Sequence, residues 1–139
     1  MKIAAVVRNA SFRHEVVVST GASEQLLAVP PKSSGRGSNV NGGEFLMLAL
    51  ATCYCNDLYR EAEKLGIFIE SVEVEASAEF PGIGLAATNI SYRAKVSSSA
   101  VAEEIAELLR ITDAVAEIHN EPPRLFRRHP GLSQAAIGS

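Results

Sequence analysis

One uninterrupted run, residues 44 to 64, constrains the fold of this chain more than any other feature. The run contains no proline or glycine and is rich in Ala, Leu, Met and Glu, which predicts a helix of about six turns. Between residues 45 and 55 only Thr52 is plainly polar, and a helix that is apolar on every side must be surrounded by protein or membrane. Toward residue 64 one side becomes charged, so we expect the helix to leave the interior there and to end at Gly66.

Size and charge exclude several classes of protein. A chain of 139 residues with 47% hydrophobic and 21% charged residues has the composition of one globular domain. We expect residues 1–120 to form that domain and residues 121–139 to be a C-terminal extension that is loosely structured or packs on a partner chain. The net charge of -3 argues against nucleic-acid binding, which needs a concentrated positive surface.

The length of the apolar runs bears on location. None reaches the roughly 18 residues of a membrane span, and the N-terminus lacks the apolar core of a signal peptide. We therefore expect a cytoplasmic protein that does not enter membranes.

Alternating apolar residues and turn residues predict the strands and a second helix. Five segments have strand character: residues 2–8, 13–20, 25–29, 71–80 and 87–96. The first three predict an antiparallel meander and the last two a hairpin. Residues 97–99, all serine, are predicted to cap a second helix, and residues 112–120 either continue that helix or begin a short new one. The fold class is therefore α+β, an antiparallel sheet with two helices.

The segment from residue 30 to residue 43 is rich in Gly, Pro, Ser and Asn, which predicts a loop. A loop before a buried helix either carries ligand contacts or serves as a flexible crossover, and both interpretations stay open. It lacks the Lys-Ser/Thr ending of a P-loop and the spacing of a dinucleotide fingerprint, so we expect no cofactor.

Three stretches together resemble the OsmC/Ohr family of osmotically induced and organic-hydroperoxide-resistance proteins. They are Asn41-Gly-Gly-Glu-Phe-Leu-Met-Leu-Ala-Leu-Ala-Thr-Cys53, Ala62-Glu-Lys-Leu-Gly-Ile67 and Ser71-Val-Glu-Val74. The resemblance covers about residues 1–120. It implies an intertwined homodimer in which two long central helices pack together and the sheets wrap around them. Such a dimer would explain how a short chain surrounds an apolar helix.

The resemblance also implies an activity, the thiol-dependent reduction of organic hydroperoxides. A thiolate on the central helix attacks the peroxide, and the sulfenic acid condenses with a second cysteine. Cys53 matches the attacking cysteine. Arg13 is the match for the arginine that lowers the thiol pKa and orients the peroxide, and Glu44 is the acidic residue kept at the head of the helix.

The chain departs from the family pattern at two positions. The second cysteine would fall near Asp113, where there is no thiol, and Gly43 stands where the acid that pairs with the arginine belongs. Cys55 does not easily replace the missing thiol, because side chains at i and i+2 of a helix diverge by about 200°. We therefore predict a one-cysteine peroxidase that uses an external thiol. The alternative is a noncatalytic small-ligand-binding or stress-response protein that retains the fold.

Cys53 and Glu44 each also have a simpler interpretation. Cys53 is then a small buried apolar side chain, and its activation would require a cation such as Arg13 or Arg60. Glu44 lies about two and a half turns before Cys53, so it either joins the site across a dimer or only stabilises the helix N-terminus.

A second group of polar residues follows near the end of the predicted domain. Asp113, Glu117 and His119, together with Cys55, are further candidates for ligand binding. Asp113 and Glu117 share a helix face, but no tight ligand motif accompanies them, and we expect no metal site. In the simpler interpretation Asp113 belongs to a helix cap and Glu117 is exposed.

Overall fold

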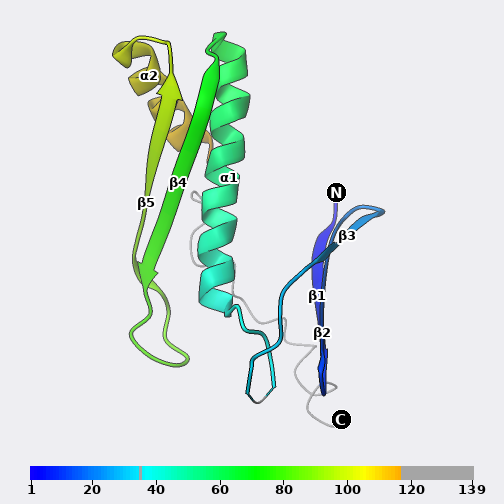
Figure 1. Cartoon of the computed structure of the whole chain (residues 1–139). Helices are drawn as coiled ribbons and strands as arrows, with labels where there is room; N and C mark the ends of the chain where they lie inside the picture. Colours follow the sequence, from blue (N-terminus) through cyan, green and yellow to red (C-terminus); the bar gives the residue numbers. More distant parts are fainter. Residues whose placement is uncertain (35, 117–139) are drawn as a thin grey trace. The chain divides into compact units, whose positions relative to one another are not determined.

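The computed structural model describes residues 1–34 and 36–116. These residues form two compact units, one from Met1 to Leu46 and the other beginning at Met47. Three strands, a long helix, a two-stranded hairpin and a second helix follow one another along the chain (Figure 1). The predicted α+β class and the order of its elements are confirmed.

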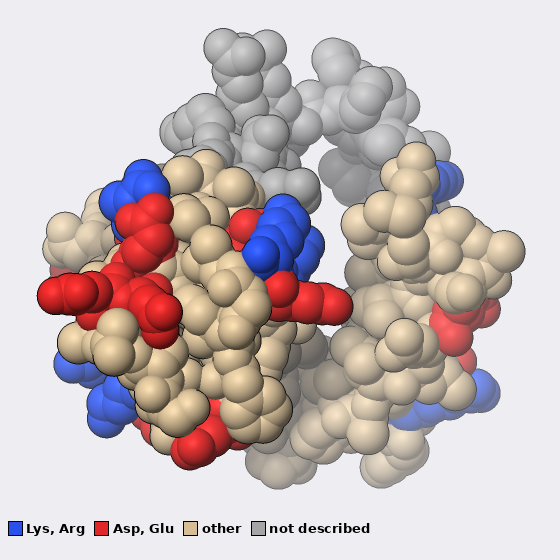
Figure 2. Space-filling view, turned by 90° about the horizontal axis from the view of Figure 1, so that it is seen from above, with Lys and Arg blue, Asp and Glu red and all other residues tan. Residues whose placement is uncertain are grey.

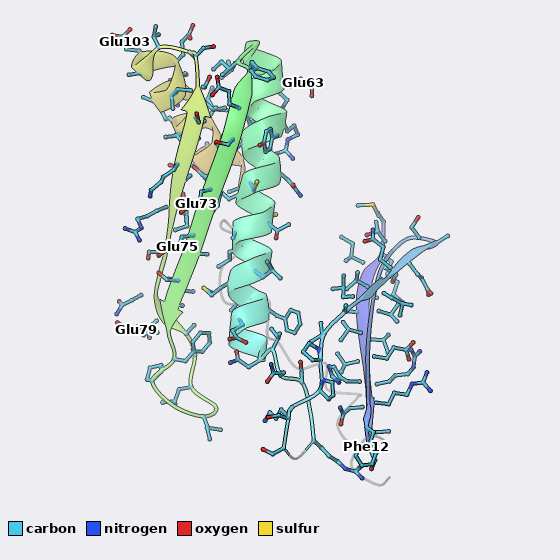
Figure 3. The ribbon with its side chains drawn as sticks, in the orientation of Figure 1. Phe12, Glu63, Glu73, Glu75, Glu79 and Glu103 are labelled. Carbon is cyan, nitrogen blue, oxygen red and sulfur yellow. The ribbon has the colours of Figure 1, made fainter. Side chains whose placement is uncertain are left out.

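The first unit contains an antiparallel meander in the order β1-β2-β3. Its strands are β1 (Ile3–Ala10), β2 (Arg13–Thr20) and β3 (Ser23–Leu27). Strand β3 begins before its predicted position, because Thr20 pairs with Ser23 across a two-residue turn in which Gly21 has a φ of 58°. Phe12 forms the tip of the turn between β1 and β2 and is fully exposed (Figure 3).

The long helix α1 spans Gly42–Leu65 and has a defined cap at each end. At its start, the carboxylate of Glu44 accepts the backbone N–H of Asn41 at 2.9 Å, and Oδ1 of Asn41 accepts the N–H of Glu44 at 2.8 Å. At its end, Gly66 adopts a φ of 69°, and the N–H of Ile67 reaches the carbonyl of Ala62 at 2.9 Å. The predicted stop at Gly66 is confirmed.

The second unit packs a hairpin and a helix against α1. The hairpin consists of β4 (Ile69–Glu79) and β5 (Thr88–Ser98), and helix α2 spans Ala102–Val115. Figure 1 shows the hairpin running alongside α1. The buried core joins all of these elements and consists of Tyr54, Leu58, Ala62, Ile69, Leu108 and Ala116. Val72, Val74, Tyr92, Ala94 and Val96 cover it from the inner face of the hairpin.

The outer face of the hairpin is charged. Glu73, Glu75 and Glu79 lie along β4 (Figure 3), and Glu75 accepts a 3.0 Å bond from Arg93 on β5. In Figure 2 acidic and basic side chains are interspersed over the described residues of the face in view, without an extended basic surface.

The cap predicted for α2 is wrong. Ser98 belongs to β5, where its hydroxyl donates to the carbonyl of Phe68 at 2.6 Å, so the helix begins only at Ala102. The carboxylate of Glu104 instead accepts the N–H of Val101 at 3.3 Å. At the other end α2 continues through Thr112, whose buried hydroxyl bonds to the carbonyl of Leu108 at 2.7 Å. Thr112 therefore lies inside the helix and does not cap a new one.

The burial of α1 also differs from the prediction. Its buried residues are Tyr54, Asp57, Leu58, Glu61 and Ala62, all in the C-terminal half, whereas Leu48 in the apolar half is 56% exposed. The expectation that the helix leaves the interior toward its C-terminus is wrong within one chain, because α2 and the hairpin pack against that half.

Two buried carboxylates accompany this arrangement. Asp57 accepts a 2.9 Å bond from Arg60, and Glu61 accepts a 3.0 Å bond from Lys64. The two cations balance the buried charges, as buried carboxylates require.

Candidate functional site

Both cysteines lie on α1, where Cys53 and Cys55 are each partly buried. Because the helix is regular over this segment, the two side chains point to opposite flanks and do not form a disulfide with each other. The residue between them, Tyr54, points into the core and is only 4% exposed. The packing of Tyr54 therefore fixes the rotation of the segment that carries the two thiols.

Tyr54 is part of a hydrogen-bonded group that the sequence did not predict. Its hydroxyl donates to Oδ1 of Asp113 at 2.7 Å, and the hydroxyl of Tyr92 donates to the same oxygen at 2.7 Å. The two rings lie 4.5 Å apart between centroids, tilted by 41°. We call Tyr54, Tyr92 and Asp113 the tyrosine–aspartate cluster. It joins α1, β5 and α2 at one point.

The surroundings of both phenols stabilise their protonated forms. Burial, and then the hydrogen bond to the Asp113 carboxylate, raise the pKa of Tyr54 far above its ordinary value of 10.0. The same two causes raise the pKa of Tyr92 to about 12. Both hydroxyls therefore keep their protons at neutral pH and remain donors to Asp113.

Asp113 thus has a clear structural role. It stands in the last turn of α2, at the position where the resemblance places the second cysteine of the family, and there it accepts two phenol hydrogens. Glu117 and His119, the other members of the predicted group, lie outside the described residues. Over residues 1–34 and 36–116, no three His, Cys, Asp or Glu side chains are placed to hold a metal ion.

The charged residues predicted to assist Cys53 have other contacts. Arg13 belongs to the first unit, its side chain is 77% exposed, and it approaches Glu15 at 4.0 Å. Glu44 is engaged in the cap of α1 with Asn41. Arg60, the second cation considered for Cys53, instead contacts the buried Asp57 and Glu61 at 2.9 and 3.3 Å. These contacts balance the positive charge of Arg60 within the same helix.

Two members of the tyrosine–aspartate cluster were missed because their signal is weak in a sequence. Tyr92 occupies an inward position of an alternating strand, and Tyr54 sits in an apolar run, so both read as ordinary core residues. A buried tyrosine usually bonds its hydroxyl to a partner, and that requirement was the available signal. The sequence does not show which acceptor, far along the chain, provides it.

The chain is an α+β protein. Its cysteine-bearing helix follows an N-terminal meander and precedes a hairpin and a second helix. The chain belongs to the OsmC-like protein family, whose model matches residues 35–121. No curated protein matches it significantly in sequence.

Solved structures agree on the fold. An OsmC-like protein from Mycoplasma pneumoniae is 17% identical, with a TM-score of 0.59 over 86% of this chain and 87% of that one. An organic hydroperoxide resistance protein from Elizabethkingia anophelis is 16% identical, with a TM-score of 0.57 over 86% of each chain. A further organic hydroperoxide resistance protein, from Legionella pneumophila, is 15% identical, with a TM-score of 0.55 over 86% of this chain and 88% of that one. At these identities the likeness establishes the fold.

Across residues 1–34 and 36–116, no helix combines the length and the apolar character needed to cross a bilayer.

Proposed function

We propose that this protein reduces organic hydroperoxides through Cys53 and that an external thiol returns the enzyme to its reduced state. The observation that carries the proposal is the position of Cys53, partly buried on the central helix of an OsmC-like chain. Two of the structures with this fold are organic hydroperoxide resistance proteins. A partly buried thiol retains access for a small substrate.

The proposed reaction has three steps. The Cys53 thiolate attacks the terminal peroxide oxygen, the O–O bond breaks, and the alkoxide leaves as an alcohol after taking up a proton, while the thiolate becomes a sulfenic acid. A first external thiol then attacks the sulfenic sulfur and releases water, forming a mixed disulfide. A second external thiol breaks that disulfide and regenerates the Cys53 thiol.

The external thiol is required because the chain lacks a suitable second cysteine. The resemblance places the second cysteine of the family near Asp113, whose carboxylate accepts hydrogen bonds from Tyr54 and Tyr92. Cys55, on the opposite flank of α1, would have to distort the helix to reach Cys53.

We further propose a homodimer with α1 at its centre. Leu48 is 56% exposed and Tyr59 is 45% exposed on this helix, although apolar helices are normally covered. A second copy of the chain would cover these side chains. In such a dimer, Arg13 and Glu44 can contribute to a site shared between the two chains. In this arrangement the guanidinium of Arg13 stabilises the Cys53 thiolate. The reaction is one of oxidative-stress defence in the cytoplasm.

A hydroperoxide consumption assay tests the activity. Wild-type protein, Cys53→Ser and Cys55→Ser are incubated with cumene hydroperoxide and, in parallel, with dithiothreitol, glutathione or a dithiol such as dihydrolipoamide. Wild type and Cys55→Ser are expected to consume peroxide catalytically with at least one thiol, whereas Cys53→Ser falls to the rate of the thiol alone. Equal consumption by wild type and Cys53→Ser would contradict the proposal.

The alternative is a noncatalytic protein that binds a small apolar or electrophilic ligand. The favouring observation is that Asp113 and Glu44, which stand at positions linked to the chemistry, both have structural hydrogen bonds. This alternative predicts that Cys53 resists alkylation and forms no sulfenic acid with cumene hydroperoxide. Mass spectrometry after treatment with a sulfenic-acid probe separates the two functions, because only the peroxidase gives a labelled Cys53.

A further inference from the structure

The tip of the β1–β2 hairpin is joined to the loop before α1 by a short chain of hydrogen bonds. The backbone N–H of Gly37 donates to Oδ1 of Asn9 at 3.2 Å, and Nδ2 of Asn9 lies 3.0 Å from Nδ1 of His14. Arg36 adds a second link by donating to the hydroxyl of Ser11 at 2.8 Å. We call residues 36–40 the Gly37 loop. The loop is therefore attached to the hairpin at two points, the backbone of Gly37 at Asn9 and the side chain of Arg36 at Ser11.

The hydrogen bonds that link Gly37, Asn9 and His14 have a fixed order of donors and acceptors. The Gly37 N–H is a donor only, so the Asn9 atom facing it is the carbonyl oxygen, and the amide NH₂ must face His14. Nδ1 of His14 is consequently an acceptor without a hydrogen. The neutral imidazole then carries its hydrogen on Nε2.

Nε2 of His14 has no hydrogen-bond partner among the residues that the structure describes. The atom is shielded from solvent, and within the described residues no polar group lies within hydrogen-bonding distance of it. The neutral ring tolerates this arrangement at the modest cost of one unpaired donor. An imidazolium does not, because it would hold one N–H against the Asn9 NH₂ and bury the other without an acceptor.

Charged groups near this point do not offset that conflict. Alternation along the strands places Arg8, Arg13, Glu15 and Glu24 on the opposite face of the meander, where Glu15 pairs with both arginines. The segment before α1 contributes two cations, Lys32 beside Gly37 and Arg36 against Ser11. Neither cation is a hydrogen-bond acceptor for a ring N–H of His14.

We propose that uptake of a proton by His14 releases the Gly37 loop from the β1–β2 hairpin, which makes this contact an acid-operated latch. When Nδ1 becomes a donor, Asn9 must turn its carbonyl oxygen toward the ring, and the same rotation removes the acceptor of the Gly37 N–H. The rotation leaves the bond from Arg36 to Ser11 in place, so the release concerns the backbone at Gly37, in the segment that leads into α1. The latch is a property of the first unit and does not depend on the proposed peroxidase activity.

NMR spectroscopy on the full chain tests the first premise. At pH 8 the ring ¹⁵N shifts of His14 are expected to show hydrogen on Nε2 and none on Nδ1. A hydrogen on Nδ1 at that pH would overturn the assignment of donors and with it the latch.

Amide hydrogen exchange tests the release itself. Between pH 8 and pH 5, the range in which histidine changes its charge, the protection factor of the Gly37 amide is expected to fall about tenfold, the effect of losing one hydrogen bond of about 1.4 kcal/mol. His14→Gln removes this pH dependence, whereas the control His129→Gln keeps it. A wild-type protection factor that stays constant, or a dependence that survives in His14→Gln, would refute the proposal.

A change at Asn9 should reverse the effect. In Asn9→Asp a carboxylate accepts both the Gly37 N–H and the imidazolium N–H, so acid should strengthen the contact. Protection of Gly37 is therefore expected to rise, or at least not to fall, from pH 8 to pH 5. If Asn9→Asp loses protection in acid as wild type does, the amide of Asn9 is not the switching group.

Discussion

The tyrosine–aspartate cluster makes a quantitative prediction about stability. In Asp113→Ala the hydroxyls of Tyr54 and Tyr92 lose their common acceptor. Tyr54 is 4% exposed and has little access to water, so its unpaired hydroxyl costs about 1–3 kcal/mol, whereas Tyr92 lies closer to solvent and regains part of its hydrogen bonding. We expect Asp113→Ala to lower the free energy of unfolding by about 2–3 kcal/mol. Asp113→Asn, which keeps an acceptor oxygen but not the charge, should cost about 1 kcal/mol.

A double-mutant cycle isolates the hydrogen bond between Tyr54 and Asp113. Tyr54→Phe should cost about 1.5 kcal/mol in the wild-type background, since it removes a donor to a charged acceptor. In the Asp113→Ala background the same change should cost less than about 0.5 kcal/mol, because the bond is already gone. The expected coupling energy is therefore about 1 kcal/mol or more.

Urea unfolding followed by circular dichroism measures all four proteins of the cycle. One protein concentration must be used throughout, because association changes apparent stability. Glu75→Ala is the matched control: this carboxylate bonds to Arg93 on the surface, so its loss should cost less than about 1 kcal/mol. Additive costs for Tyr54→Phe and Asp113→Ala, or a cost for Asp113→Ala no larger than that of the control, would refute this account of the cluster.

Two further predictions concern alkaline pH and association. The raised pKa of Tyr92 means that its contribution to stability is complete below the unfolded value of 10.0 and is lost as pH rises through about 12, and the contribution of Tyr54, whose pKa is raised further, is lost at still higher pH. Urea midpoints from pH 8 to pH 11 should fall more steeply for wild type than for the double variant Tyr54→Phe/Tyr92→Phe. If the midpoints of the two proteins fall in parallel, the two tyrosines are not the source of the pH dependence. Leu48→Asp should yield a folded monomer by light scattering and circular dichroism, while Ile83→Asp, at an exposed loop position, leaves the dimer intact. A dimeric Leu48→Asp would place the interface elsewhere.

The sequence predicted the elements well wherever the signal is local. The run without glycine or proline before Gly66 predicted α1, and strict alternation predicted β4 and β5. These features depend on neighbours a few residues apart, which a sequence displays directly. The helix cap predicted at the serines before α2 was wrong because it relied on local pattern alone. The hydroxyl of Ser98 instead donates to the carbonyl of Phe68, 30 positions away.

The candidate site was predicted only in part. Cys53 stands out by its place in an apolar helix, and Asp113 stands out as the residue at the position of a missing thiol. The partners of Asp113 were not predictable, because Tyr54 and Tyr92 reach it from separate elements. The same holds for Asp57, which reads as a solvated charge and is buried beside Arg60.

The sequence by itself determined the α+β class, the central helix and the placement of both cysteines on that helix, since each depends on residue identity and short-range periodicity. The tertiary structure alone decided which half of α1 is buried, which oxygen receives the tyrosine hydroxyls and which side chain faces His14. Those outcomes depend on contacts between residues far apart in the chain, where a donor and an acceptor are matched only after packing has brought them together.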